Sequence, residues 1–365
     1  MRVAVAGGGA VGLVAAGDLA DRGVDVTLYE RDELGSGATG RAAGICYDAF
    51  AGKLDAAVAD RALARYREWG LLEPCPYVWA ARERGDETAI RGQVEEMRAH
   101  GRAVERISPA ELGDRYPTLR TEGIEAAGIA TAAGVLDPDA VVTRLVERAR
   151  ARGVTVEMTA PVSLAEPTTV ETSSGKRDFD AVVAAAGPAT KPLVADAGVS
   201  LALKAYRTQA LVTDPFEGAL PSFYDATAEF YWRPHGDALL VGGGAHAADP
   251  ADWDAEADPA FVESILEDVR AATTLDPTAD RAWAGLCTAT PDRDPLVGRV
   301  ADGLWVATGW QGHGLMRAPA MGEFVAERVC GTSPRIDAAL SDRFDPTRFD
   351  GDEQFDPLGD PTADW

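Results

Sequence analysis

The sequence predicts an α/β protein in which a parallel, helix-covered sheet is interrupted by an inserted α+β domain built on a mainly antiparallel sheet. A strand, a glycine turn, a helix and a second strand follow one another within residues 2–30, and this is the unit from which parallel sheets are built. Apolar strands that run into glycine turns return at 180–187 and 303–309. Between them the pattern changes, and 365 residues suffice for two domains.

The first elements are predicted from apolar runs and from glycines that mark the ends of helices and strands. RVAVA at the start has the short, continuous apolar character of a strand buried on both faces. Gly23 is typical of a residue that ends a helix. In order we expect a strand at 2–6, a helix at 11–22, a strand at 24–30, a glycine-rich loop at 31–45 and a helix at about 50–70.

The middle and late elements follow from the same signals. From about 75 to 132 we expect short mixed segments, because prolines interrupt the pattern. Asp137 is the expected N-cap of the next helix and Pro138 its first residue. The remaining expectations are a helix to about Arg152, strands at 154–158, 180–187 and 303–309, alternating strands over 201–245 that include 238–244, and helices at 259–272 and 318–329.

These elements predict two domains that are interleaved in the sequence. The parallel-sheet domain is expected to be discontinuous, and the second domain is inserted into it in two pieces. The tail is rich in Asp and Pro and is expected to be a solvated extension. The predicted limits are 1–75, 133–197 and 281–332 for the parallel-sheet domain, 76–132 and 198–280 for the inserted domain, and 333–365 for the acidic tail.

The charge balance is strongly acidic. There are 35 Lys and Arg against 59 Asp and Glu, which gives a net charge of −24. This field repels nucleic acid and anionic membranes, so neither is an expected partner. Only four of the basic residues are lysines, and abundant acid with scarce lysine resembles the surfaces of halophile proteins. An ordinary acidic protein from a GC-rich genome is the alternative.

The sequence predicts neither a membrane span nor a metal site. No run of about 18 apolar residues occurs, and the first residues do not form a signal peptide. The four cysteines form no CxxC pair, and the four histidines are scattered. We therefore expect reduced thiols, no metal and a cytoplasmic location.

The first chemical motif is the glycine turn Gly7-Gly8-Gly9-Ala10-Val11-Gly12 between a strand and a helix. Gly7 permits a tight turn, Gly9 lets the backbone approach a pyrophosphate, and Gly12 allows the helix to pack closely on the strand. Glu30 closes the second strand, where an acidic group accepts the hydroxyls of an adenosine ribose. The motif therefore predicts a dinucleotide, but FAD and NAD both use it.

Two further segments suit a flavin dinucleotide. The loop 35–45 supplies backbone amides and a hydroxyl for a long, bent ligand. The segment 308–316 (TGWQGHGLM) precedes a helix, and the N–H groups at a helix start stabilise negative charge of the kind that forms on a reduced flavin.

Four ordered signatures carry a family resemblance. They are AVAGGGAVGLVAAGDLADRGVDVTLYER (4–31), GSGATGRAAGI (35–45), DAVVAAAGPAT (180–190), and WAGLCTATPDRDPLVG leading to LWVATGWQGHGLMRAPAMGEFVAE (283–327). Together they resemble the D-amino acid oxidase superfamily of FAD enzymes, in its glycine oxidase and sarcosine oxidase branch, over about residues 2–330. The resemblance implies a Rossmann-like FAD-binding domain and an inserted substrate domain.

The same resemblance implies which residues hold the cofactor. Arg41 matches a position beside the isoalloxazine ring, although a phosphate contact or a surface salt bridge is its alternative role. The full set implied or expected to bind FAD is Gly7, Gly9, Val11, Gly12, Glu30, Arg31, Ala38, Thr39, Arg41, Ala43, Gly44, Ile45, Val162, Gly187, Gly309, Gly312, His313, Gly314, Leu315 and Met316.

Departures from the family pattern concern the flavin linkage and the substrate. Gly285 stands where sarcosine oxidases attach the flavin through cysteine, so we expect non-covalent FAD. Leu240 replaces a lysine that assists oxygen, which favours a dehydrogenase. Met316 replaces a lysine that binds substrate carboxylate, and Cys287 and Gly312 replace two arginines that do so in glycine oxidase. The usual partners of a planar carboxylate are therefore missing.

Four residues remain as candidates for catalysis or substrate binding. Tyr231 matches a substrate-facing tyrosine, with a core aromatic as the alternative, and Arg233 would share its face of the strand as a carboxylate clamp or a surface salt bridge. His313 is a catalytic candidate, or a structural hydrogen-bonding residue. Arg41, beside the ring, completes the set.

The expected reaction is hydride transfer to flavin N5 from a carbon next to a neutral amine, after which the imine hydrolyses. Secondary amines of the sarcosine, dimethylglycine or proline type are the first choice, followed by D-amino acids and 2-hydroxy acids. The electron acceptor is oxygen or another carrier. Two alternatives stay open: the FAD subunit of a larger dehydrogenase, and a flavin binder without turnover.

Overall fold

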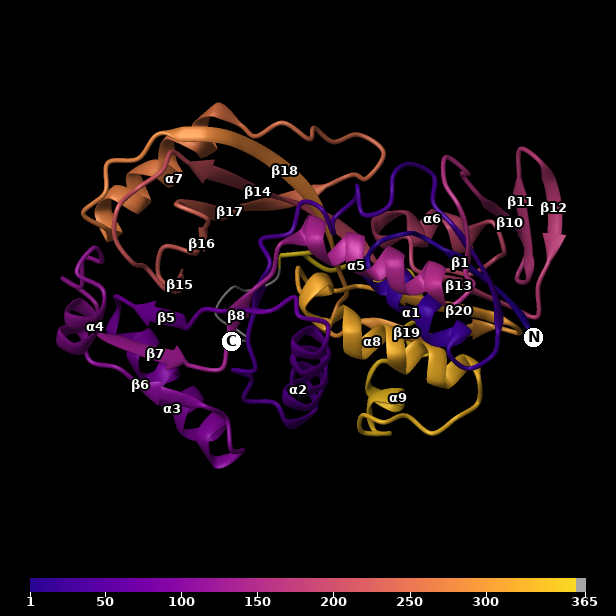
Figure 1. Ribbon diagram of the computed structural model, residues 1–365, viewed down its shortest axis with the longest axis horizontal. Coiled ribbons are helices and arrows are strands. Elements are labelled where there is room, and N and C mark those ends of the chain that lie inside the picture. Colours follow the sequence, from indigo (N-terminus) through magenta and orange to yellow (C-terminus); the bar gives the residue numbers. More distant parts are fainter. Residues whose placement is uncertain (359–365) are drawn as a thin grey trace.

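Two large sheets lie side by side along the long axis of the molecule, with loops and short strands between them (Figure 1). The computed structural model describes residues 1–358, apart from the side chains of residues 84–86. One sheet has six strands and is mainly parallel, and the other has eight and is mainly antiparallel. This confirms the predicted fold class.

The six-stranded sheet has the order β19-β20-β13-β1-β2-β9. Five strands are parallel, namely β1 (Arg2–Ala6), β2 (Asp25–Tyr29), β9 (Thr155–Glu157), β13 (Ala181–Ala184) and β20 (Leu304–Thr308), and β19 (Leu296–Ala301) runs antiparallel to β20. The central strands are apolar throughout because helices and loops cover both faces of the sheet.

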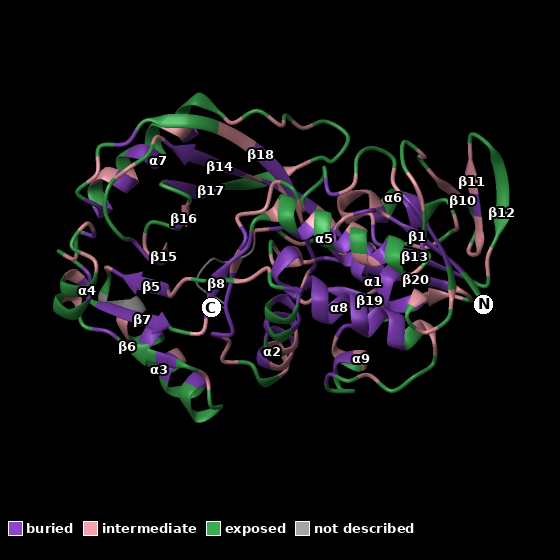
Figure 2. Cartoon of the chain, viewed as in Figure 1, coloured by how far each residue is buried: buried purple, intermediate pink, exposed green. Residues whose placement is uncertain are grey.

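Helices packed beside this sheet form the deepest part of the core, and Figure 2 shows α1 and α8 almost wholly buried. Gly322 lets them touch, since a Cβ there would lie 2.6 Å from Val14 Cβ. Asp137 caps one of the neighbouring helices by accepting from two backbone N–H groups, and Pro138 is its first residue, as predicted. The helices are α1 (Ala10–Ala20), α2 (Lys53–Glu68), α5 (Pro138–Ala151) and α8 (Gly314–Val329).

The eight-stranded sheet has the order β18-β14-β17-β16-β15-β5-β7-β6, with β15 and β5 parallel and the other neighbours antiparallel. Helix α7 packs its apolar side against β17 and β18. The elements are β5 (Tyr77–Ala81), β6 (Val104–Arg106), β7 (Ala126–Ala130), β14 (Lys204–Thr213), β15 (Ser222–Asp225), β16 (Phe230–His235), β17 (Ala238–Ala248), β18 (Ala279–Ala289), α4 (Pro109–Arg115) and α7 (Pro259–Ala272). Strand β18 extends past the domain boundary predicted at residue 280.

Smaller elements complete the chain. Strands β3 (Ile45–Cys46), β4 (Glu73–Pro74) and β8 (Gly134–Val135) form a short sheet where the chain passes between the two large ones, and β10 (Ser163–Glu166), β11 (Thr169–Thr172) and β12 (Gly175–Asp178) form a peripheral one (Figure 1). The short helices are η1 (Gly187–Ala189), α6 (Thr190–Ala195), α9 (Leu340–Arg343) and η2 (Pro346–Arg348).

Helix α8 begins at Gly314, earlier than the predicted start at Ala318, although Pro319 lies inside it. Proline has no N–H to donate to the carbonyl four residues before it, which here belongs to Leu315. The hydroxyl of Tyr66 donates to that carbonyl instead, at 2.6 Å. The helix therefore continues through the proline because Tyr66 of α2 donates to the carbonyl that the proline leaves without a partner.

Helix α3 (Arg84–Ala99) is a second difference, because short mixed segments were expected there. Its buried positions Ile90, Val94 and Met97 follow the spacing of a helix face. The rest of the segment is polar, so this sparse apolar pattern was not enough to predict a helix.

The expectation of a fully solvated tail is wrong for its described part. Ile336, Leu340 and Phe344 are buried, and the Phe344 carbonyl accepts from the N–H of Val297 at 2.8 Å. These apolar side chains are spaced among acidic residues, whose abundance suggested a solvated segment. Residues 359–365 lie outside the described part.

Within residues 1–358, no helix is long and apolar enough to cross a membrane, and no group of three or more His, Cys, Asp or Glu side chains could hold a metal ion.

Candidate active site

A cavity of about 1990 Å³ is lined by residues from both large sheets and from the loops between them. Its walls include the opening glycine turn, the loop 35–45, the turn 310–317 and side chains from six strands of the eight-stranded sheet. Typical small-molecule sites measure ~300–1,000 Å³. The cavity is therefore large enough for a long cofactor and a small substrate together.

The opening glycine turn forms one end of the cavity. Gly7 has a φ of +116°, and a Cβ there would lie 2.4 Å from the carbonyl oxygen of Ala185. Gly12 faces the backbone rather than the cavity, since its Cβ would lie 2.0 Å from the Gly7 carbonyl oxygen. Gly9 is the N-cap of α1 and offers no side chain, so the backbone of the helix start lies at the cavity edge.

Glu30 follows β2 and lines the same end of the cavity. Its carboxylate accepts from the N–H of Gly8 at 2.8 Å and from the N–H of Asp32 at 3.0 Å. Arg31 and Val162 also line this end, and Arg31 forms an exposed ion pair with Asp32 at 3.2 Å. The carboxylate is thus fixed at the tip of the strand, at the edge of the cavity.

The loop 35–45 is held against the glycine turn. The hydroxyl of Thr39 accepts from the N–H of Ala10 at 3.0 Å, which ties the loop to the start of α1. Gly44 has a φ of +76°, and its Cβ would lie 2.2 Å from the carbonyl oxygen of Leu136. Only glycine fits this close approach of two backbones.

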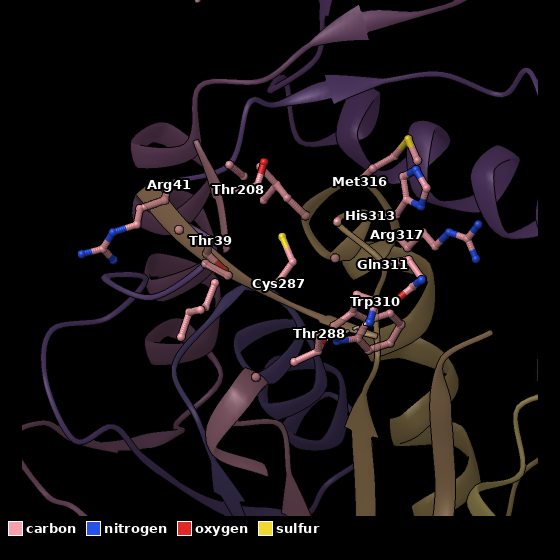
Figure 3. Close-up of a pocket in the computed structure, with 18 of the residues that line it drawn as sticks. Thr39, Arg41, Thr208, Cys287, Thr288, Trp310, Gln311, His313, Met316 and Arg317 are labelled. Atoms are coloured by element: carbon pink, nitrogen blue, oxygen red, sulfur yellow. Dashed lines mark hydrogen bonds between the residues drawn. The ribbon is translucent and has the colours of Figure 1, made fainter. Parts of the chain in front are cut away.

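Arg41 lines the cavity but turns its guanidinium away from the other side chains drawn there (Figure 3). Nη1 donates to the carbonyl of Ser36 and, at 3.2 Å, to that of Gly37. The guanidinium also lies 5.9 Å from the ring centre of Trp253. The guanidinium of Arg41 therefore stabilises its own loop. This agrees better with the surface role considered for Arg41 than with a position beside the flavin ring.

The turn that precedes α8 is fixed to β18. The hydroxyl of Thr288 accepts from the N–H groups of Gly309 and Trp310 at 3.2 and 3.3 Å, and the Thr288 carbonyl accepts from the N–H of Gln311 at 2.9 Å. Figure 3 shows Thr288 beside Trp310. Gly309 does not line the cavity, and its φ of +79° and the 2.6 Å from its Cβ to Thr290 Cγ2 explain the glycine.

His313 is the N-cap of α8 and lines the cavity. Its Nε2 lies 3.5 Å from the hydroxyl of Tyr47, and its ring meets Phe50 edge to face. Burial, reinforced by the charge of Arg317, lowers the pKa of His313 to about 3. The imidazole is therefore neutral near pH 7. It can donate one hydrogen bond and accept another, but it is a poor base.

Two glycines make room for aromatic rings that form a flat wall of the cavity. Gly242 pairs with Tyr231 across β17 and β16, and a Cβ at Gly242 would lie 2.2 Å from the tyrosine ring. Gly128 pairs with Trp79 across β7 and β5, and its Cβ would lie 2.3 Å from the indole. Both rings therefore lie over the backbone of the neighbouring strand.

This aromatic wall continues toward the turn of α8. Tyr77 stacks on Tyr47 with ring centres 4.5 Å apart and lies 6.0 Å from Trp79. Burial raises the pKa of Tyr47 to about 12, and it raises that of Tyr77 well above its ordinary value. Burial likewise raises the pKa of Tyr231. These phenols stay neutral and contribute apolar surface with a few hydroxyl groups.

Cys287 and Tyr206 are a cross-strand pair on β18 and β14, and both line the cavity. Burial raises the pKa of Cys287 to about 11, so it is a neutral thiol. Figure 3 shows its sulfur directed toward the region of Thr208. Gly285, on the same strand, also lines the cavity and offers no sulfur.

Arg233 does not line the cavity, so the expectation that it reaches substrate is not met by this geometry. It faces the same side of β16 as Tyr231, but its Nε donates to the carbonyl of Ala43 and its Nη1 donates to that of Pro234 at 2.9 Å. Nη2 is buried and has no partner among the described residues. Burial lowers the pKa of Arg233. The arginine supports the loop from behind because Ala43 lies between it and the cavity.

The structure brings the other predicted site residues together around one cavity. Gly12 and Gly309 act by packing, as described above. The predicted residues that line the cavity are Gly7, Gly9, Val11, Glu30, Arg31, Ala38, Thr39, Arg41, Ala43, Gly44, Ile45, Val162, Gly187, Tyr231, Gly312, His313, Gly314, Leu315 and Met316.

Several lining residues were not predicted from the sequence. Tyr77 and Trp79 have the alternating spacing of one strand face, and Tyr47 follows the loop 35–45 directly, so a signal existed for each. Arg317 was not predicted because it lies one residue past the run 309–316 that the resemblance implied for the cofactor. The other unpredicted lining side chains include Phe50, Asp55, Ile90, Gln93, Met97, Tyr206, Thr208, Tyr224 and Trp253.

Comparison with known proteins gives relatives of the expected kind. Human mitochondrial sarcosine dehydrogenase is 27% identical over 373 residues, which cover 92% of this chain but 40% of the relative. Rat mitochondrial dimethylglycine dehydrogenase is 26% identical and is covered over 44% of its length. The chain thus spans less than half of these longer relatives. Glycine oxidase of Pseudomonas aeruginosa is 27% identical, with 93% of this chain and 97% of the relative covered.

Solved structures show the same fold. L-Proline dehydrogenase from P. horikoshii superposes with a TM-score of 0.88 at 24% identity, covering 97% of this chain and 99% of that one. Glycine oxidase from Geobacillus kaustophilus gives 0.86 at 21% identity, with 95% and 99% covered. The family described as FAD dependent oxidoreductase (DAO) matches residues 2–328. The chain therefore belongs to the DAO family of FAD-dependent oxidoreductases.

Proposed function

We propose that this enzyme takes a hydride from a carbon next to a neutral amine nitrogen of a small amine or amino acid. The main supporting observation is that two glycine-containing turns, at residues 7–9 and 310–316, line one cavity together with a wall of uncharged aromatic side chains. The names of the relatives support the choice, since sarcosine, dimethylglycine, glycine and proline are all amino acids or N-methylated amino acids.

The residues present fit FAD. Gly187 has a φ of +56° and no atom within 4 Å of its Cβ position, so the cavity is open there. We propose that the Gly7–Gly9 turn and the start of α1 hold the pyrophosphate, that Glu30 holds the ribose, and that the loop 35–45 and the turn 310–316 hold the flavin. When bound, FAD supplies the hydride acceptor.

The chain itself would bind the substrate, orient it and exclude water. The wall of Tyr77, Trp79 and Tyr231 offers apolar surface, which desolvates an amine and favours its neutral form. Hydride transfer from carbon leaves a C=N bond, and water then converts it to a carbonyl compound and an amine. Neutral His313 can hold the substrate nitrogen or a water by a hydrogen bond, and it is not required as a base.

A substrate panel tests the proposal. The holoprotein would be mixed anaerobically with secondary amines, D- and L-amino acids and 2-hydroxy acids, and loss of the visible absorbance of the oxidised flavin would be followed. Reduction by amines or amino acids, with a carbonyl product, is expected. Reduction by hydroxy acids alone, or by no compound in the panel, would overturn the proposed function.

We propose that the electron acceptor is a carrier other than oxygen. The support is Leu240, which is buried beside Ala43 in a small apolar cluster and brings no charge to the flavin loop. Turnover with an artificial dye should exceed oxygen consumption with the same substrate, and equal rates would contradict this assignment.

A second candidate is the FAD subunit of a larger dehydrogenase. It is favoured by the 40% and 44% coverage of sarcosine and dimethylglycine dehydrogenase, whose remaining length has no counterpart in this chain. Mass measurement in solution together with dye-linked turnover separates the two, because robust turnover by the isolated chain would exclude an obligatory partner.

The cellular setting is also a proposal. The net charge of −24 with four lysines supports a halophile, and four free thiols support a reducing cytoplasm. Unfolding at low salt and stability at molar KCl are expected, and indifference to salt would count against halophily.

A further inference from the structure

We propose that Arg317 binds the carboxylate of the substrate, so that the enzyme acts on amino acids in preference to simple amines. This inference rests on the proposed function and specifies its substrate class. Arg317 would supply the positive charge that is missing at Gly312 and Met316. Arg233 does not supply it, because its side chain does not line the cavity.

The other arginines of the cavity wall are less suitable. Arg31 lies at the ribose end and is paired with Asp32 on the surface. Arg41 turns outward onto carbonyls of its own loop. Neither guanidinium stands near the aromatic wall and the turn of α8, where the reacting part of a substrate is expected.

Arg343 and Arg293 also line the cavity. Arg343 donates twice to the carboxylate of Asp294, at 2.6 and 2.7 Å, and forms a third contact of 2.9 Å with Asp55. Arg293 donates to the carbonyl of Leu358 at 3.1 Å and has further interactions. Both are engaged by the described parts of the chain.

Arg317 lies beside the proposed reaction centre and is only partly engaged. Its backbone N–H closes the first turn of α8 on the His313 carbonyl at 3.0 Å, and its side chain lines the cavity while remaining 8% exposed. Nη1 lies 3.0 Å from Asp55 Oδ1, and the guanidinium lies 5.2 Å from the ring centre of Phe50. Nε is buried and has no acceptor among the described residues.

A guanidinium with one edge unpartnered suits a planar carboxylate. A buried donor without an acceptor is costly, and a carboxylate oxygen of a ligand in the cavity would supply that acceptor. Asp55 does not saturate Arg317, because its other oxygen contacts Arg343 at 2.9 Å. Asp55 therefore holds Arg317 at the wall, and the ligand supplies the missing acceptor.

The geometry also accounts for selectivity. A carboxylate on Arg317 places the rest of an amino acid against His313 and the tyrosines beside it, a wall that carries no negative charge of its own apart from Asp55. The carboxylate of Asp55 is already paired with Arg317 and Arg343, so it is not free to hold an ammonium group. The amine is thus bound in its neutral form, as hydride removal requires.

The test compares ligands that differ by one carboxylate. Propionate and propylamine would be titrated into the holoprotein, with the change in the flavin spectrum giving each Kd, and proline and pyrrolidine would be compared as reductants of the flavin. The variants are R317M, R317K, D55N and R293Q. R299M serves as the control, since Arg299 is exposed and lies outside the cavity.

In R317M the Kd of propionate should rise about 10- to 100-fold with little change for propylamine, and R317K should lie between R317M and the native protein. D55N should bind propionate at least as tightly as the native protein, because it removes the competing negative charge while the amide oxygen can still accept from Nη1 of Arg317. Parallel losses for propionate and propylamine in R317M, weaker propionate binding in D55N, or a selective loss in R293Q would each overturn the assignment. Because propionate binding needs no turnover, this result is independent of the substrate panel.

Discussion

The hydroxyl of Tyr66 should stabilise α8 because Pro319 removes the normal partner of the Leu315 carbonyl. Tyr66 and the carbonyl are buried, and the oxygen–oxygen distance is 2.6 Å. In Tyr66→Phe the carbonyl loses its donor and cannot reach water. A buried unsatisfied group costs about 1–3 kcal/mol, so the free energy of unfolding should fall by about that amount.

A double-mutant cycle isolates this bond from other effects of the substitution. Pro319→Ala restores an N–H that can donate to the Leu315 carbonyl within the helix, so that Tyr66→Phe should cost less than about 0.5 kcal/mol in that background. The expected coupling is therefore about 0.5–3 kcal/mol. A value near zero would refute the claim that Tyr66 replaces the proline's missing donor.

Urea unfolding of the FAD-saturated protein, followed by tryptophan fluorescence, measures the four free energies of the cycle. Flavin release is a second readout, because Leu315 belongs to the turn that lines the cavity. Weaker retention of FAD in Tyr66→Phe than in the double variant is expected, and equal retention would show that the turn does not depend on this bond.

Three further predictions concern the cavity. Gly9→Leu should abolish retention of FAD by filling the approach to the pyrophosphate, and an intact yellow holoprotein would contradict that placement. Gly242→Val should displace the ring of Tyr231, which raises KM at least several-fold while FAD stays bound; an unchanged KM would mean that the ring does not meet substrate. His313 has a folded pKa of about 3 against an ordinary 6.5, so the unfolded chain binds the extra proton. Stability should therefore fall as the pH drops from 6.5 toward 3, and His313→Gln should lessen that fall; identical acid profiles would contradict it.

Most of the fold was predictable because its signals are local. The strand at residues 2–6, the turn that follows it and the helix capped by Asp137 each depend on neighbours within a few positions. The start of α8 was missed because a proline inside a helix normally breaks it, and the compensating hydroxyl of Tyr66 comes from another helix. No local pattern contains that partner.

The cofactor side of the cavity was easier to predict than the substrate side for a physical reason. In the proposed site, backbone groups hold the pyrophosphate and the flavin, and the requirement for glycine at Gly7 and Gly44 is visible in the sequence. Substrate residues depend on which side chain the tertiary packing leaves uncovered. Tyr231 and Arg233 occupy the same face of β16, yet Ala43 covers the arginine while the glycine opposite leaves the tyrosine ring at the cavity.

The same distinction explains why the proposed carboxylate-binding residue is Arg317 and not Arg233. Arg233 has its Nε engaged by the Ala43 carbonyl, so a substrate would have to displace the loop to reach it. Arg317 closes the first turn of α8 on the His313 carbonyl, and the hydroxyl of Tyr66 binds the Leu315 carbonyl in the same part of the helix. Loss of that hydroxyl should therefore weaken propionate binding as well as the helix, although Tyr66 touches no ligand. Unchanged propionate affinity in a destabilised Tyr66→Phe protein would separate the start of the helix from the carboxylate site and remove this link.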